Sequence, residues 1–319
     1  MIICIGNALV DSLQQIEEDV IDKLNLNKAR MTLVDKERSN FLLSNMSNPT
    51  YAAGGSAANT AYWIAALGGS VGFIGKISDD DLGKQFRSSL SEHGLSDFTV
   101  LEEENEQTGL CAIFITPDGE RTMNTYLGAG AQLSMGDLNE ESIKNCNILY
   151  MEGYLWDRLP SKEAFMYASS INKQSGGKNA LSLSDVFCVE AHRDSFVDLI
   201  KENIDYVFCN EDEIKALTEQ DSTEKSLDFI SKNFPKIDQL VCTLGAKGAI
   251  VMKENKQYFF EATDAKVVDK TGAGDYFAAG YLFGIEEKLS MQETALIANK
   301  SAAHVISEIG VRPEKPFIL

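Results

Sequence analysis

The sequence has only three histidines, His93, His192 and His304, and none of its six cysteines form a CxxC pair. Structural zinc sites and disulfide frameworks need closely spaced ligands or paired thiols, so neither is expected to organise this chain. Several cysteines, such as Cys209 and Cys242, lie inside apolar runs. We therefore expect buried, reduced thiols and a cytoplasmic protein.

Basic residues are also scarce. The chain has 29 Lys and Arg against 48 Asp and Glu, which gives a formal net charge of −19. This charge disfavours binding to nucleic acids or anionic membranes. No apolar run approaches the length that spans a bilayer, and the first five residues are too short and uncharged for a signal peptide. The P-loop pattern Gly-x4-Gly-Lys-[Ser/Thr] is absent as well. We expect small molecules as partners.

Short apolar runs alternate with helical patterns along most of the chain. The expected strands are residues 2–5, 71–77, 148–151, 180–183, 206–209 and 239–243. The expected helices include residues 82–93, 162–173, 195–203 and 223–234. This alternation predicts an α/β fold with a mostly parallel central sheet and helices on both faces. At 319 residues, the chain is long enough to form one large domain, residues 1–319.

Two stretches interrupt the alternation. Residues 12–51 are polar and charged over a long distance. Residues 98–127 have the pattern of antiparallel strands joined by the turn Pro117-Asp118-Gly119-Glu120. We predict that the two stretches form a small β lid over the ligand-binding edge of the sheet.

The segment Asp269-Lys-Thr-Gly-Ala-Gly-Asp275 is the most informative one in the chain. Its glycines leave the backbone uncovered directly before an apolar helical run. Amides at a helix start are unpaired and lie at the positive end of the helix dipole, so they bind phosphate or a developing oxyanion. Asp275 lies among these amides, where a carboxylate can accept a proton from a hydroxyl. The segment indicates phosphoryl transfer, although an Asp in the first turn of a helix is also favourable without catalysis.

A second motif, Gly54-Gly55-Ser56-Ala-Ala-Asn59, opens a helix of small residues. A glycine pair lets a ligand approach the backbone, and the Asn59 amide can both donate to and accept from a sugar hydroxyl. The alternative is a tight helix-packing surface with Ser56 as its N-cap.

Together the two motifs resemble the signatures of the ribokinase-like carbohydrate kinase family, and the resemblance covers essentially the whole chain. It implies a three-layer ribokinase-like fold with a small β lid, and ATP-dependent phosphorylation of a hydroxyl. Asp275 corresponds to the catalytic base, and the amides of Gly272, Ala273 and Gly274 correspond to the anion hole. The residues that the resemblance places at the phosphate acceptor are Gly54, Gly55, Ser56 and Asn59.

Polar residues that follow other strands fit the same family. Open parallel sheets bind ligands at the carboxyl ends of their strands. Asn7 and Asp11 follow the first strand, and the resemblance assigns both to the sugar; without it, Asp11 is a solvated loop acid. Asn210 and Glu213 resemble the family's Asn-x-x-Glu motif, in which Mg²⁺ is held near the nucleotide phosphates, partly through water. An acidic helix N-terminus is the alternative for that pair.

The resemblance also places the nucleotide. The family's Thr-x-Gly-x-x-Gly loop, which wraps ATP, is matched by Thr243, Gly245 and Gly248. Asn299 resembles a residue that lines the adenine pocket.

Several family members are activated by a monovalent cation such as K⁺, and the resemblance assigns Asp269 to that ion. The chain departs from the family's signature at two positions. Lys270 adds a charge, and Tyr276 is bulkier than the small residue often found after the catalytic Asp.

The opening Gly6-Asn-Ala-Leu-Val-Asp11 and the long segment between Asp11 and Gly54 resemble adenosine kinases more than ribokinases. We therefore predict adenosine as the acceptor, phosphorylated to AMP. A purine needs an apolar or aromatic slot. The residues that we expect to form it, each of which can instead be lid core, are Phe114, Met123, Tyr126 and Leu133. The alternatives are a kinase for a free sugar such as ribose or fructose, and a ligand-sensing homologue. We expect the protein to be a monomer or a homodimer.

Overall fold

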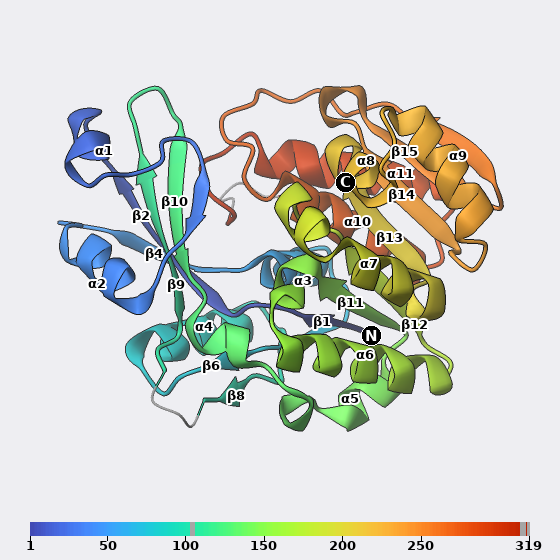
Figure 1. Ribbon diagram of the computed structural model, residues 1–319, viewed down its shortest axis with the longest axis horizontal. Coiled ribbons are helices and arrows are strands. Elements are labelled where there is room, and N and C mark those ends of the chain that lie inside the picture. The colour runs from blue at the N-terminus through green and yellow to red at the C-terminus, as the bar shows by residue number, and fades with distance from the viewer. Residues whose placement is uncertain (103–105, 313–316, 318–319) are drawn as a thin grey trace.

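The structure of the protein, a computed structural model, describes residues 1–102, 106–312 and 317. A large α/β body carries a smaller β lobe, which lies on the left in Figure 1. The body is built on a nine-stranded sheet. In spatial order its strands are β16 (Lys256–Phe260), β15 (Ala249–Lys253), β14 (Gln239–Thr243), β13 (Tyr206–Asn210), β12 (Lys178–Ser182), β11 (Ile148–Glu152), β1 (Ile2–Ile5), β5 (Val71–Ile74) and β7 (Ser96–Asp97).

The sheet is mostly parallel. Among its described strands, the antiparallel pairs are β14 with β15 and β15 with β16, at one edge of the sheet. Strand β1 lies inside the sheet between β5 and β11, so the chain builds the sheet outward from β1 in both directions. Ligands of such sheets bind where the strand order reverses, beyond the carboxyl ends of the strands. The ends of β1 and β11 mark that position.

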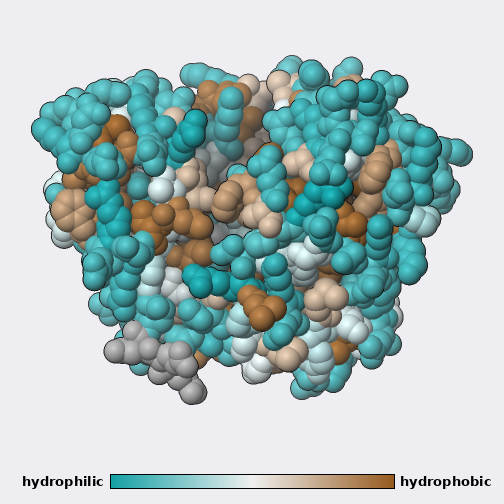
Figure 2. Space-filling view, viewed as in Figure 1, coloured by the Kyte–Doolittle hydropathy of each residue, from teal (hydrophilic) through white to brown (hydrophobic). Residues whose placement is uncertain are grey.

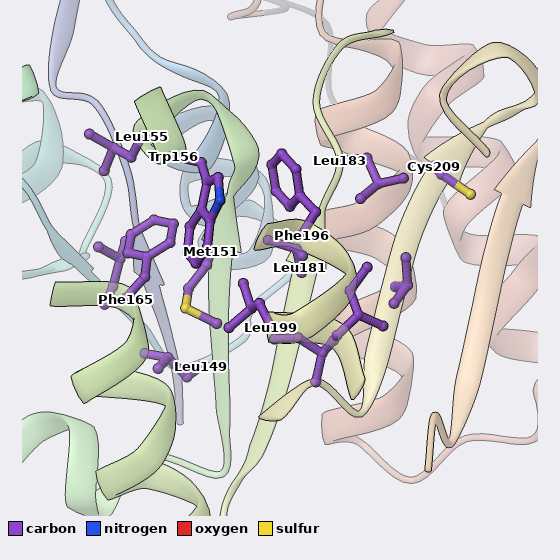
Figure 3. Packing of buried hydrophobic residues seen from close by; sticks show 14 of the residues in the cluster. Leu149, Met151, Leu155, Trp156, Phe165, Leu181, Leu183, Phe196, Leu199 and Cys209 are labelled. Atoms are coloured by element: carbon purple, nitrogen blue, oxygen red, sulfur yellow. The ribbon is translucent and has the colours of Figure 1, made fainter. Parts of the chain in front are cut away.

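Helices cover both faces of the sheet because its strands are apolar on both sides. In β1, Ile3 and Ile5 pack into one core, whereas Ile2 and Cys4 pack into the core on the other face. Alternate side chains of a strand point to opposite faces, so each face needs its own helical layer. In the first core, Trp156 stacks on Phe196 with ring centroids 5.4 Å apart (Figure 3). The three layers confirm the predicted fold class.

The two helical layers consist of different parts of the chain. The helices over the first core are α5 (Glu140–Asn145), α6 (Leu159–Gln174), α7 (Val186–Asn203), α8 (Glu211–Thr218) and α9 (Thr223–Asn233). Those over the second core are α3 (Ser56–Ala66), α4 (Asp81–Glu92), α10 (Ala273–Glu286) and α11 (Met291–Val305). Short 3-10 helices are η1 (Gly128–Gln132), η2 (Met135–Asp137), η3 (Gly153–Asp157) and η4 (Gly245–Lys247). No helix within the described ranges has the length and apolar character needed to cross a membrane.

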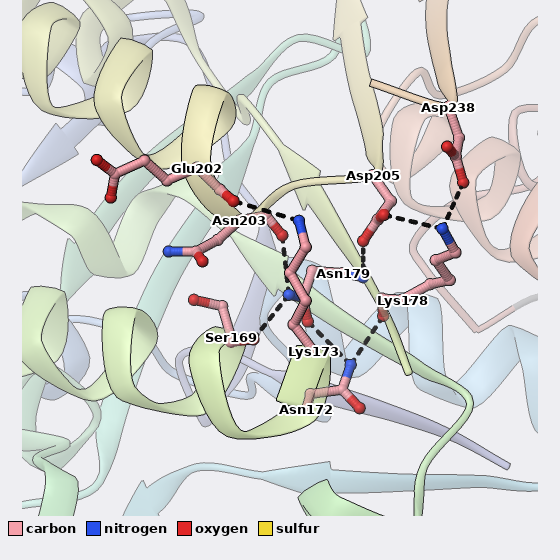
Figure 4. A network of polar contacts seen from close by, with 9 residues as sticks. All are labelled: Ser169, Asn172, Lys173, Lys178, Asn179, Glu202, Asn203, Asp205 and Asp238. Atoms are coloured by element: carbon pink, nitrogen blue, oxygen red, sulfur yellow. Dashed lines mark hydrogen bonds and ion pairs between the residues drawn. The ribbon is translucent and has the colours of Figure 1, made fainter. Parts of the chain in front are cut away.

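A buried polar network joins strands and helices at the amino-terminal ends of β12 and β13 (Figure 4). The Asn179 side chain donates from Nδ2 to the carbonyl oxygens of Ser169 (2.8 Å) and Asn203 (2.9 Å). Asp205 accepts from the backbone amide of Asn179 (2.9 Å) and from Lys178 Nζ (3.0 Å). Satisfied networks of this kind stiffen a core. This network therefore stiffens the end of the sheet opposite the carboxyl ends of its strands.

The smaller lobe, called the lid below, is a five-stranded sheet. Its strands in spatial order are β3 (Met31–Leu33), β10 (Arg121–Tyr126), β9 (Gly109–Ile115), β2 (Leu9–Gln15) and β4 (Thr50–Gly54). The turn at residues 117–120 joins β9 to β10 in the antiparallel sense, as predicted, with Gly119 at φ +83°. Helices α1 (Asp19–Lys23) and α2 (Lys36–Ser44) enclose a separate core around Leu42 and Phe114.

The boundaries of the lid differ from the predicted residues 12–51 and 98–127. Its strands begin at Leu9 and end at Gly54 in the first stretch, and run from Gly109 to Tyr126 in the second. The two short strands before Gly109 belong elsewhere, because β7 pairs with the main sheet and β8 (Val100–Leu101) pairs with β6 (Lys76–Ile77). The predicted single strand at 71–77 is therefore wrong. The chain leaves the main sheet at Gly75, where a Cβ would come within 2.6 Å of the Phe73 ring.

Helix α7 begins at Val186, well before the predicted start at residue 195. The Asp185 side chain caps it by accepting from the amide of Phe187 at 2.8 Å. Phe187 is exposed on the helix and His192 has non-helical dihedral angles, so the apolar repeat is obscured in the first half. All six cysteines are buried and free, as the sequence predicts.

Candidate active site

A cavity of about 450 Å³ lies where the carboxyl ends of β1, β11, β12 and β13 face the inner side of the lid. Figure 2 shows the hollow between the two lobes, with apolar residues gathered along it. Its volume is in the range that binds small molecules. The predicted site residues that line it are Asn7, Asp11, Gly55, Ser56, Asn59, Asn210, Glu213, Thr243, Gly272, Ala273, Gly274 and Asp275.

The start of α10 forms the end of the cavity where the predicted anion hole lies. Gly272 caps the helix with φ +77°, a conformation that favours glycine. The amide of Ala273 donates to the carbonyl of Lys270 at 3.3 Å. The amides of Gly272 and Gly274 make no hydrogen bond among the described residues, so they are available to an anion in the cavity.

Asp275 is held by two donors from the other signature. Ser56 Oγ donates to its Oδ1 at 2.6 Å, and Asn59 Nδ2 donates to its Oδ2 at 2.9 Å. Burial raises the pKa of Asp275, while these hydrogen bonds and the charge of Arg312 act in the opposite direction. The two motifs, far apart in the sequence, thus orient one carboxylate.

The alternative for the second motif made Ser56 the N-cap of its helix, but the helix begins one residue earlier than that. Gly55, not Ser56, is the N-cap of α3, with φ +97°. A Cβ on Gly55 would come within 2.2 Å of the Asn7 carbonyl oxygen, so the glycine is needed where α3 meets the end of β1. Asn59 was predicted to bind a sugar hydroxyl; in the structure its Oδ1 accepts from Arg312 and its Nδ2 donates to Asp275.

Asp11 lies in the lid rather than in the loop predicted after β1. It is the third residue of β2, and Gly54 on β4 pairs with Leu9, two residues before it. A Cβ on Gly54 would come within 2.5 Å of Asp11 Oδ1, which explains a glycine at that position. Burial raises the pKa of Asp11 to about 6, although Arg312 and Arg121 lower it. Gly54 leaves room for the Asp11 carboxylate but does not itself line the cavity.

Glu152, the last residue of β11, is a site residue that the sequence analysis missed. Its Oε1 accepts from the backbone and side-chain nitrogens of Asn7, both at 2.7 Å, and its Oε2 accepts from the Ala57 amide at 2.6 Å. Burial raises its pKa to about 7. Asn7 Oδ1 is buried and has no hydrogen-bond partner within the described residues. It lines the cavity, so a hydroxyl donor there can pair with it.

Asn210 and Glu213 cap the N-terminus of α8, which is the alternative to a Mg²⁺ site that the sequence offers for this pair. Asn210 Oδ1 accepts from the amides of Asp212 and Glu213, both at 2.9 Å, and Glu213 accepts from Asn210 in return. Burial raises the pKa of Glu213 to about 7. Both residues also line the cavity, so capping does not exclude a role toward a ligand. The described residues hold no cluster of three or more His, Cys, Asp or Glu side chains that would suit a metal.

The other residues that were expected to bind the nucleotide do not all line the cavity. Thr243 lines the cavity, whereas Gly245, Gly248 and Asn299 lie outside it. Gly248 has φ +111°, and a Cβ there would come within 2.0 Å of the Phe260 carbonyl oxygen, so this glycine has a structural reason. Asn299 is buried in α11 and donates to the Ala295 carbonyl at 3.0 Å.

Asp269, which was assigned to a monovalent cation, is engaged by the protein at both oxygens. Its Oδ1 accepts from the amide and hydroxyl of Thr271, at 3.0 and 2.8 Å. Its Oδ2 accepts from the Gly310 amide at 2.8 Å and forms an ion pair with Arg121 of the lid at 2.7 Å. Three hydrogen bonds and one ion pair therefore engage the Asp269 carboxylate within the protein.

The apolar part of the cavity differs from the predicted slot. Of the four candidates only Met123 lines it; Phe114 lies in the outer core of the lid, Leu133 in the core of the body, and the Tyr126 hydroxyl donates to Glu106. Phe114 points outward because alternate residues of a strand face opposite sides. The apolar residues that line the cavity from the lid and the loop after it are Leu9, Met31, Leu33, Ile113, Met123 and Leu127.

Fold and site together place the protein among the phosphotransferases that use ATP and an alcohol acceptor. Residues 21–317 match the pfkB family carbohydrate kinases, so the chain belongs to that family, which contains sugar and nucleoside kinases. The chain is similar to a probable sugar kinase from Rhizobium etli CFN 42 and to an adenosine kinase from Sinorhizobium meliloti. Each is 35% identical with a TM-score of 0.91, over 99% of this chain and 96% of the other. Fructokinase-1 of Oryza sativa subsp. japonica is 28% identical over 281 residues, 83% of this chain and 85% of the relative.

Proposed function

We propose that the protein transfers the γ-phosphoryl group of ATP to the primary hydroxyl of the ribose of adenosine, which yields AMP and ADP. The supporting observation is a single cavity with a polar floor and an apolar lid side. Asn7 and Asp275 line the floor, and Asp11 lines the cavity from lid strand β2, so ribose hydroxyls can pair with all three. Met31 and Ile113 lie on the lid side, where a purine is removed from water.

The geometry suits phosphoryl transfer by one base and a set of amides. Asp275 orients the acceptor hydroxyl and takes its proton as the bond to phosphorus forms. The amides of Gly272 and Gly274, which make no hydrogen bond among the described residues, stabilise the charge on the moving phosphoryl group. Asn210 and Glu213, already occupied by their mutual hydrogen bonds, would hold Mg²⁺ through water, and the ion neutralises phosphate charge when bound.

A free-sugar kinase is the second candidate, because the polar floor alone is sufficient for a sugar and a 35% identical structural relative is a probable sugar kinase. The charge of the cavity distinguishes acceptors further. The ionisable acids that line it are Asp11, Glu152, Asp157, Asp185, Glu213 and Asp275; the basic residues are His192 and Lys270. Like charges brought together repel strongly at low dielectric, so we expect a neutral acceptor rather than a sugar phosphate.

A panel of acceptors tests the proposal. With adenosine, guanosine, inosine, ribose, fructose and fructose 6-phosphate at matched concentrations, ADP release should give adenosine at least about a tenfold advantage in kcat/KM over the free sugars. Fructose 6-phosphate should be at least about tenfold worse than fructose, its matched neutral control. Faster turnover of a free sugar than of any nucleoside would contradict adenosine as the acceptor and leave the kinase assignment intact.

We also expect no requirement for a monovalent cation, because Arg121 already supplies the positive charge at Asp269. Replacing K⁺ by tetramethylammonium at constant ionic strength should change kcat by less than about twofold. In Arg121→Gln, where Asp269 loses its cation, K⁺ should increase activity. Strong activation of the unmodified protein by K⁺ would show that a cation competes with Arg121 or binds elsewhere.

A further inference from the structure

The chain after α11 returns to the active site although it belongs to none of the recognised motifs. The Gly310 amide donates to Asp269 at 2.8 Å, and the Tyr276 hydroxyl donates to the carbonyl of Val311 at 2.7 Å. Both partners flank the anion-hole loop, so this short segment is fixed next to it. The same segment carries Arg312, which contacts Asn59, a partner of Asp275.

Arg312 contacts two residues of α3, Asn59 and Tyr62. Its Nη1 donates to Asn59 Oδ1 at 2.8 Å and to the Val311 carbonyl at 2.7 Å. The guanidinium lies over the ring of Tyr62, 4.2 Å from its centroid. Cation–π contact and two hydrogen bonds hold the group in one place.

The Asn59 amide therefore has a defined orientation. Its oxygen faces a guanidinium donor and its nitrogen faces the Asp275 carboxylate, 2.9 Å away. Rotating the amide by half a turn would place its oxygen against Asp275 and its NH₂ against Arg312, so both contacts would become repulsive. Removing Arg312 would remove the group that selects between the two orientations.

We propose that Arg312 is a positioning residue for the catalytic base: through Asn59 it holds Asp275 oriented toward the acceptor hydroxyl. This assignment rests on the proposed role of Asp275 and not on the identity of the acceptor. Arg312 also contributes charge. The ionisable groups around Asp275 are Arg312 on the C-terminal segment, Asp11 on β2, Tyr150 and Glu152 on β11, Tyr154 on η3 and the adjacent Tyr276.

Arg312 is a cation that lowers the pKa of Asp275 against the effect of burial. Without it, the carboxylate should take up a proton at a higher pH. The acidic limb of the kcat/KM profile should therefore move to higher pH in a variant that lacks the charge, by up to about one unit. A residue that only stabilised the fold would lower the active fraction without moving that limb.

The test compares Arg312→Gln, Arg312→Lys and the matched distant control Arg193→Gln, using whichever acceptor of the panel the wild-type protein phosphorylates best. We expect Arg312→Gln to lower kcat about tenfold, to move the acidic limb upward and to leave KM for ATP unchanged. Arg312→Lys should lower kcat while keeping the limb close to its wild-type pH, because the charge remains. Arg193→Gln should match the wild type.

A double-mutant cycle with Asn59→Ala completes the test. If Arg312 acts through Asn59, Arg312→Gln should add less than about twofold to the loss in the Asn59→Ala background. Wild-type kcat and an unmoved acidic limb in folded Arg312→Gln would overturn the proposal, as would a loss that is undiminished when Asn59 is absent. Should Arg312→Gln fail to fold, Arg312→Lys alone and in the Asn59→Ala background provides the same cycle. Failure of the wild type to phosphorylate any acceptor would contradict the proposed function instead.

Discussion

Asp275→Asn should lower kcat by at least about 100-fold while leaving the binding of ATP and acceptor largely intact. The amide has nearly the same shape as the carboxylate and can still accept from Ser56 Oγ, so the fold should persist. It cannot take the proton of the acceptor hydroxyl. The reaction would then lose its base and retain only the anion hole and the positioning of the substrates.

The control for this variant is Asp79→Asn, which removes a largely exposed carboxylate that pairs with Lys84. Its kcat should equal that of the wild type. Single-turnover kinetics separate chemistry from product release, and thermal unfolding confirms that each variant is folded. Near-wild-type turnover in a folded Asp275→Asn would show that the reaction does not use this carboxylate as its base.

Asp11→Ala should weaken acceptor binding by about 10- to 150-fold, which corresponds to about 1.5–3 kcal/mol for a lost hydrogen bond to a charged group. The Kd for ATP should stay within about twofold of the wild type, because Asp11 lies on the lid strand β2, whereas Asn210 and Thr243 end strands of the main sheet. Calorimetry with each ligand measures the two constants separately.

An exposed acid of the same lobe is the matched control for Asp11. Asp19→Ala removes a carboxylate on α1 that pairs with Lys23, and it should change neither constant. Equal weakening of ATP and acceptor binding by Asp11→Ala would mean that the side chain supports the lid as a whole and does not bind the acceptor.

Part of this site follows from the sequence because local patterns define it. The glycine-rich segment before Asp275 and the Gly54-Gly55 pair each specify a backbone conformation, and parallel strands bring their carboxyl ends together. Glu152 was missed although the same rule applies to it: it ends an apolar strand at the same edge as Asn7. The expected strand ended at residue 151, so examining the residue that follows each expected strand would have found it.

Other features depend on tertiary contacts that leave no local signal. Arg312 belongs to no motif, and its position beside Asn59, 253 residues away in the sequence, depends on how the C-terminal segment folds back. The pairing of Arg121 with Asp269 joins the lid to the body, so neither residue identifies the other. In β9 the apolar residues Ile113 and Phe114 are both β-formers, and the packing of α1 and α2 on the outer face of the lid decides which of them faces the cavity.

The central claim is that this site transfers phosphate from ATP to the primary hydroxyl of a ribose. Incubating the protein with adenosine and ATP labelled at the γ-phosphate, and then identifying the labelled product, tests it most directly. The account predicts one labelled AMP, phosphorylated at the primary hydroxyl, for each ADP formed. Label that appears only as free phosphate, or on a secondary hydroxyl, would contradict it.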